Sequence, residues 1–206
     1  MKKESGAILL VVFVLILAVT LAYALSPKSS VGTTSISTST SSVSGLILSL
    51  SLNSSIIQIG HGISFSASLF NSLSTENNVS TASNWALPGL VLGPCGPTDS
   101  PIAFAVVKGF YTASNISSAP RVQYGLGCTT LMGGIQMYSF KPMSSNATVI
   151  GNCEMNRCLI EPMIMTRSVD GYWSGNSFVS FTQGAYTGVV ADEWGSFTVA
   201  QFTVTS

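Results

Sequence analysis

The residues able to do chemistry in this chain are few, and they form no recognised catalytic pattern. His61 is the single histidine among the 206 residues. This excludes histidine-rich metal sites and leaves one imidazole for any Ser-His-Asp arrangement. Because His61 stands between two glycines, we expect it to be an exposed turn residue. No G-x-S-x-G nucleophile motif occurs.

The carboxylates and sulfur-containing side chains point to no reaction either. The acids that follow residue 24 show no motif spacing: Glu76, Asp99, Glu154, Glu161, Asp170, Asp192 and Glu193. Asp192 and Glu193 are interpreted as a turn before Trp194. A blue-copper site needs two histidines and a cysteine, so the numerous methionines are read as core filler. We therefore predict a protein that is not an enzyme and that has no metal or cofactor.

Four cysteines indicate disulfides in an exported protein. They are Cys95, Cys128, Cys153 and Cys158, and all follow the apolar N-terminal segment. An even number is typical of a disulfide framework, and four cysteines allow three pairings. We favour Cys153 with Cys158 and Cys95 with Cys128. The absence of a nearby histidine and the four-residue spacer argue against zinc.

Four asparagines stand in Asn-x-Ser/Thr sequons without proline: Asn53, Asn78, Asn115 and Asn146. Only 8% of the residues are charged, eight basic against eight acidic, whereas an average domain has about 25%. A positive surface for nucleic acid is therefore excluded. A hydroxyl- and amide-rich surface keeps its solvation at any pH, so we expect a fold that survives acidification in an extracellular setting.

The first 24 residues predict export. Lys2 and Lys3 precede an apolar run over residues 7–24, close to the length that spans a bilayer. The Ala-Tyr-Ala sequence ending at Ala24 favours a cleaved signal peptide, and the length of the run favours a retained membrane anchor. A pilin-type leader is a third interpretation. All three predict that the rest of the chain is extracellular, at the cell surface.

The chain divides into three predicted regions. Residues 1–24 are the signal peptide or anchor, residues 25–44 a linker or tail, and residues 45–206 one domain. Twelve of the sixteen residues 29–44 are Ser or Thr, which is typical of a flexible stalk. The threonines and Ile36 also favour extended backbone, so we expect the tail to become a strand where another chain offers an open sheet edge.

The body is predicted to be all-β. Leucines alternate with other residues over 46–52, and apolar residues alternate with serines over 63–69. Further β-branched and apolar runs, separated by turn residues, cover 102–112, 134–140, 148–150, 159–166, 177–181, 186–190 and 197–204. This pattern predicts an antiparallel sandwich or barrel.

Two ends of the body resemble an immunoglobulin-like β-sandwich. They are residues 59–71 and the final hairpin, 184–204, where Tyr186 begins the penultimate strand. In such domains a tyrosine at this position hydrogen-bonds back to the preceding corner. An apolar strand that follows a flexible tail is similar to the subunits of archaeal thread-type surface filaments, whose tail completes the sheet of the next subunit.

That resemblance implies a glycosylated surface filament subunit that polymerises by N-terminal strand donation. The groove-filling face would be Leu46, Leu48, Leu50 and Leu52. Alternatively, residues 46–52 are the domain's own first strand, and either the donor lies within residues 31–40 or there is no donor. The implied partners are copies of the chain, or other surface proteins and glycans, and the membrane if residues 7–24 are retained. The alternative functions are an anchored monomeric ectodomain for adhesion or binding, a pilin with a retained helix, and an extracellular hydrolase or inhibitor.

Overall fold

The computed structural model describes residues 35–40, 43–80, 82, 84–87, 89–90, 101–121, 137–150 and 160–206. Over these residues the chain is all-β, and they include no α-helix, as the sequence predicted. None of the described segments is a helix long and apolar enough to span a bilayer. The apolar run 7–24 lies outside the described residues.

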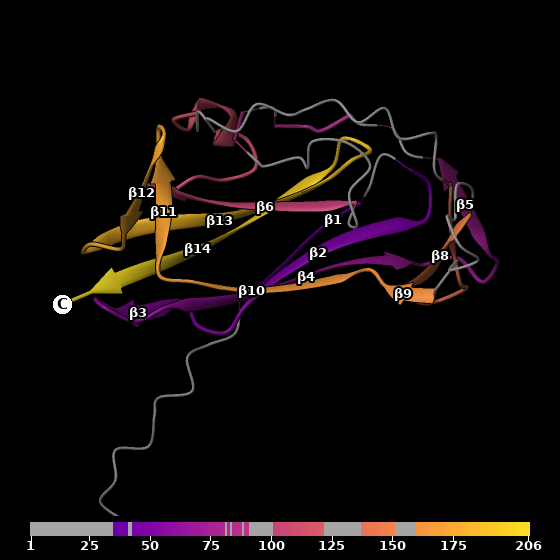
Figure 1. Ribbon diagram of the computed structural model, residues 1–206, viewed down its shortest axis with the longest axis horizontal. Helices are drawn as coiled ribbons and strands as arrows, with labels where there is room; N and C mark the ends of the chain where they lie inside the picture. Colours follow the sequence, from indigo (N-terminus) through magenta and orange to yellow (C-terminus); the bar gives the residue numbers. More distant parts are fainter. Residues whose placement is uncertain are drawn as a thin grey trace, which may run out of the picture. The chain divides into compact units, whose positions relative to one another are not determined.

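One sheet contains the strands with the clearest alternation (Figure 1). Its order is β1-β2-β4-β10, all antiparallel, with bounds Ser35–Thr40, Leu46–Leu52, Ile63–Asn71 and Ile164–Val169. β2 and β4 bury every second residue, and Leu50 lies opposite Ala67. Their alternate serines lie on the other face, where the Ser49 and Ser68 hydroxyls are 2.7 Å apart.

A second sheet is buried on both faces. Its order is β3-β14-β13-β6, with bounds Ile56–Gln58, Phe197–Thr205, Gly184–Asp192 and Ile102–Lys108. β3 runs parallel to β14, and the other pairs are antiparallel. β13 is buried without alternation from Tyr186 to Asp192. Such an unbroken buried run requires cover on each side of the sheet.

The two sheets pack face to face as a sandwich. Phe65 of β4 lies with its ring centroid 4.6 Å from that of Phe104 in β6 and 6.2 Å from that of Phe202 in β14. Gly188 of β13 makes this packing possible, because a Cβ there would lie 2.5 Å from the Phe65 ring. The architecture is consistent with the predicted immunoglobulin-like class.

Segments without regular strands cover the outer face of the second sheet. Leu87 and Leu90, with Ile116 of a short 3-10 helix (Ile116–Ser118), form a second apolar cluster with Val107 and Val189. The loop after β6 is fixed by Thr187, whose hydroxyl donates to the carbonyl of Gly109 and accepts from the amide of Tyr111. The outer cover is therefore part of the domain's core.

Two smaller sheets lie at opposite ends of the sandwich (Figure 1). One has the order β5-β7-β8-β9, with bounds Asn77–Ser80, Met137–Phe140, Asn146–Ile150 and Ile160–Pro162; the other is the hairpin of β11 (Gly171–Ser174) and β12 (Ser177–Ser180). The chain passes from β9 to β10 at the buried Met163. The Trp194 indole N–H donates to the carbonyl of Ser80 at 2.7 Å, which ties the first of these sheets to the β13–β14 turn.

Tyr186 makes the corner interaction that the resemblance implied. Its fully buried hydroxyl donates to the Thr182 carbonyl at 2.9 Å and accepts from the Thr182 amide at 3.0 Å. Its ring stacks on Phe202, with centroids 5.5 Å apart. The contact joins the start of β13 to the segment that enters it.

Several predicted bounds differ from the observed ones. The run 102–112 ends as a strand at Lys108, because Gly109 has a φ of 122° that turns the chain away. The run 159–166 is divided between β9 and β10. Of the described methionines, Met163 is buried, whereas Met137 and Met143 are exposed, so the expectation of core filler is wrong for those two.

Candidate functional site

The N-terminal strand β1 stands at one end of its sheet. It pairs with β2 alone in the sheet order, in an antiparallel register that sets Ser37 opposite Leu50 and Thr38 opposite Ser49. A tight turn connects the two strands, in which the Leu46 amide donates to the Val43 carbonyl and Gly45 has a φ of 82°. The Ser/Thr tail therefore supplies a strand to its own chain, which the sequence had predicted only for a neighbour's edge.

The four leucines of the predicted donation face lie in the core of their own chain. Leu46, Leu48 and Leu50 are fully buried, and Leu52 is 1% exposed. β2 pairs with β1 on one side and β4 on the other. Residues 46–52 are therefore a core strand of their own domain, as the alternative interpretation held.

All four sequon asparagines have exposed side chains: Asn53, Asn78, Asn115 and Asn146. The Asn53 Oδ1 accepts from the amide of Ser64 at 2.9 Å, and the Asn115 Oδ1 accepts from the amide of Thr112 at 2.7 Å. Glycan attaches through the amide nitrogen, so these two hydrogen bonds are compatible with modification. The predicted disulfide cysteines, Cys95, Cys128, Cys153 and Cys158, lie outside the described residues.

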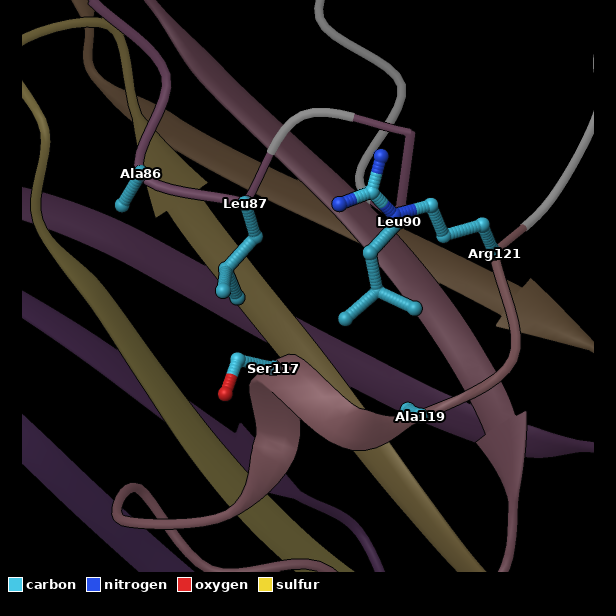
Figure 2. Close-up of a pocket in the computed structure, with 6 residues that line it drawn as sticks. All are labelled: Ala86, Leu87, Leu90, Ser117, Ala119 and Arg121. Carbon is cyan, nitrogen blue, oxygen red and sulfur yellow. The ribbon is translucent and has the colours of Figure 1, made fainter.

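A hollow of about 160 Å³ opens on the outer cover of the second sheet (Figure 2). Leu87 and Leu90 reach into it from one loop, Ser117 and Ala119 line it from the 3-10 segment, and Arg121 lies at its rim. This is below the volume of about 300–1,000 Å³ that is usual for small-molecule sites. Its described lining holds a single ionisable group and so supplies no acid–base pair.

The other residues considered for chemistry are dispersed. His61 is exposed in the turn after β3, as predicted. Lys108 is exposed at the end of β6, where its Nζ donates to the Thr182 hydroxyl at 3.0 Å. Glu76 accepts a hydrogen bond from the Ser139 hydroxyl. The described residues contain no group of three or more His, Cys, Asp or Glu able to hold a metal.

Asp192 and Glu193 form the predicted turn, but they are buried. Asp192 is inaccessible to solvent, and its Oδ1 accepts from the amides of Trp194 at 3.0 Å and Ser196 at 2.8 Å. Glu193 is 8% exposed, and its Oε1 has no hydrogen-bond partner. Burial, and then the neighbouring Asp192, raise the pKa of Glu193 from 4.5 to about 7. Adjacent acids at a strand end are typical of an exposed turn, so their local pattern contains no signal of this burial.

An exposed aromatic pair stands on the β11–β12 hairpin. Trp173 and Phe178 face each other across the strands with ring centroids 5.8 Å apart, and they are 40% and 50% exposed. Large exposed aromatic residues are enriched at recognition surfaces. The apolar run over 177–181 predicted a strand, but nothing in the sequence predicted that Trp173 and Phe178 would pair.

Comparisons with known proteins found no matching family model, no matching curated protein and no matching solved structure. The function of the chain is accordingly inferred from its own residues. Two features are available for this inference, the self-paired N-terminal strand and the exposed aromatic pair.

Proposed function

We propose that this chain is an exported, glycosylated structural subunit of the cell surface that polymerises when β1 of one copy pairs with β2 of the next. The observation that carries the proposal is the position of β1. It is a Ser/Thr strand at the end of a sheet, and its hydrogen-bonded partner there is β2, the next strand along the chain. Main-chain hydrogen bonds supply the affinity in this mode of association.

The exchange is feasible because the self-paired and the donated strand make the same ladder. Opening the turn at Val43–Leu46 frees β1 and leaves the β2 edge vacant, and a neighbour's β1 restores every backbone hydrogen bond. Swapping an identical element is a low-cost route to association, and a head-to-tail contact that does not close yields a fibre. The register of Ser35, Ser37 and Ser39 against the β2 leucines is then conserved between copies.

The burial of the leucines supports β1 rather than β2 as the donor. β2 contributes four of the most buried side chains of the sandwich, so removing it opens the core. β1 can leave without uncovering the β4 side of β2. The donor in this proposal is therefore Ser35–Thr40, and the four leucines form the strand that receives it.

Electron microscopy of the exported protein tests the proposal with matched variants of β1. We expect filaments for the natural chain and none for the double variant Ser37→Pro/Thr38→Pro, because proline cannot donate to the ladder. Two adjacent prolines remove one amide on each side of the strand. The control Ser37→Ala/Thr38→Ala keeps both amides and is expected to form filaments. A monodisperse natural chain, or filaments from the proline variant, would contradict the proposal.

The exposed Trp173 and Phe178 favour one other function, a stalked ectodomain that binds a neutral glycan or protein surface. A low charge and an aromatic pair suit a ligand without charge. In this case Trp173→Ala/Phe178→Ala abolishes cell-surface adhesion while Ile56→Ala, another exposed apolar residue, does not. Adhesion that persists in the aromatic variant would exclude this alternative.

A further inference from the structure

The turn between β13 and β14 is hydrogen-bonded to two other segments of the chain through the backbone of Glu193. The Glu193 amide donates to the Pro101 carbonyl at 3.1 Å, and the Glu193 carbonyl accepts from the Asn84 amide at 2.6 Å. Pro101 precedes β6, and Asn84 begins the part of the chain that covers the outer face of the second sheet. The backbone of Glu193 therefore holds the covering segment to the turn through the hydrogen bond with Asn84.

The side chain of the same residue is poorly suited to carry a charge. Glu193 is only 8% exposed, and its Oε1 has no hydrogen-bond partner. An ionised carboxylate in that position is costly unless a cation or donors surround it. A neutral carboxyl has a much smaller cost and offers a proton to donate.

The groups that face Glu193 do not relieve this cost. Asp192 is the charged neighbour, and the amides of Trp194 and Ser196 are directed to its own Oδ1. The described residues that bond the turn from the other segments, Asn84 and Pro101, do not titrate. Lys108 lies opposite Tyr186 at the other end of β13.

Among the described residues, Arg121 is a further cation beside the cover. It packs on Gly89, towards the far end of the covering segment. Apart from Asp192, therefore, the described neighbours neither titrate nor offset a charge on Glu193. Protonation of Glu193 itself then determines whether the turn holds the cover.

We propose that the β13–β14 turn is a proton-operated latch: protonated Glu193 holds residues 84–87, 89 and 90 over the second sheet, and ionised Glu193 releases them. The released state exposes apolar residues of the outer cluster, among them Leu87, Leu90 and Val189. β1, the strand proposed to be donated, belongs to the other sheet.

The direction of the effect follows from proton binding. The closed latch binds a proton on Glu193 at a pH where an exposed glutamate has lost it, since burial and Asp192 raise its pKa from 4.5 to about 7. Closure is fully favoured below the ordinary value. It weakens as the pH rises through the raised value, because the closed state must then bury a carboxylate.

Hydrogen exchange of the full chain between pH 5 and pH 8, corrected for the intrinsic exchange rate, tests the latch. We expect protection of the amides in 84–90 and 191–196 to fall by about tenfold or more across this range, one pKa unit being a tenfold change. Protection in β2 and β4 should stay constant. Glu193→Gln, which cannot ionise, should hold the protection at pH 8.

Two further variants keep the test decisive. Asp170→Asn removes an exposed carboxylate elsewhere and should behave as the natural chain. Asp192→Asn keeps an Oδ1 acceptor but removes the charge beside Glu193, so the loss of protection should become smaller. Constant protection of the natural chain from pH 5 to pH 8 would overturn the proposal. So would an unchanged pH response in both Glu193→Gln and Asp192→Asn.

Discussion

Tyr186 shows how a single side chain stabilises this sandwich. Its hydroxyl exchanges hydrogen bonds with both backbone groups of Thr182, and its ring lies among Phe181, Phe202 and Tyr172. The hydroxyl and the ring therefore serve different purposes: the first fixes the entry to β13, and the second fills the core. A substitution that removes the hydroxyl and keeps the ring measures the contribution of the hydroxyl to stability.

We predict that Tyr186→Phe lowers the free energy of unfolding by about 1–2 kcal/mol. The ring stays in place, but the Thr182 amide and carbonyl lose their hydrogen-bond partner. Urea denaturation measures the change. Tyr172→Phe, in the same aromatic cluster but half-buried, is the control and should cost less than about 0.5 kcal/mol. Equal losses in the two variants would show that the corner hydrogen bonds contribute nothing specific.

At the scale of elements, alternation in the sequence predicted the strands that have one face in the core. Residues 46–52 and 63–69 have such a pattern, and both are strands with every second residue buried. Strand β1 was expected only on a neighbour's edge, because hydroxyl residues show no apolar period and the local pattern contains nothing about pairing within the chain. β5, with Asn77 and Asn78, was missed for the same reason.

The burial of Asp192 and Glu193, and the outer cover of the second sheet, could not be predicted from the sequence. Asp192-Glu193 has the composition of an exposed turn, and only the tertiary approach of Asn84 and Pro101 buries it. Similarly, Leu87 and Leu90 stand in a loop, and their burial depends on the second sheet beneath them. The local sequence pattern shows which residues alternate. It contains no information about contacts between segments far apart in the chain, such as these.

The two N-terminal strands should differ sharply in their contribution to the fold. We predict that Leu50→Ala costs about 2–5 kcal/mol, because it leaves a cavity in the sandwich core. Deleting residues 25–42, which removes β1, should leave a native-like circular dichroism spectrum and a smaller loss of stability. Thermal denaturation followed by circular dichroism measures both. If the deletion unfolds the domain while Leu50→Ala is tolerated, the assignment of core and exchangeable strands is wrong.

For the whole molecule, the scarcity of charge determines the response to pH. Eight acidic residues in 206 leave few carboxylates whose protonation could unfold the domain. Glu193 adds an effect of the opposite sign, because its raised pKa of about 7 makes the folded state take up a proton as the pH falls. Its contribution is fully present below pH 4.5 and is lost as the pH rises through 7.

We therefore predict a higher melting temperature at pH 4.5 than at pH 8 for the natural chain. The difference should shrink in Glu193→Gln, whose side chain is neutral at both values. Differential scanning calorimetry of both proteins measures it. A natural chain that melts at a lower temperature at pH 4.5 than at pH 8 would contradict this account of its acid response.

The central claim is that β1 pairs between copies in the assembled protein, and crosslinking across isotope labels tests it most directly. Chains labelled with ¹⁴N and ¹⁵N, each with a photo-crosslinker in place of Thr38, are mixed in equal amounts before assembly. Thr38 lies opposite Ser49 in the register. Head-to-tail exchange predicts that roughly half of the crosslinks between β1 and β2 join a light chain to a heavy one. Crosslinks confined to chains of one label would contradict the claim.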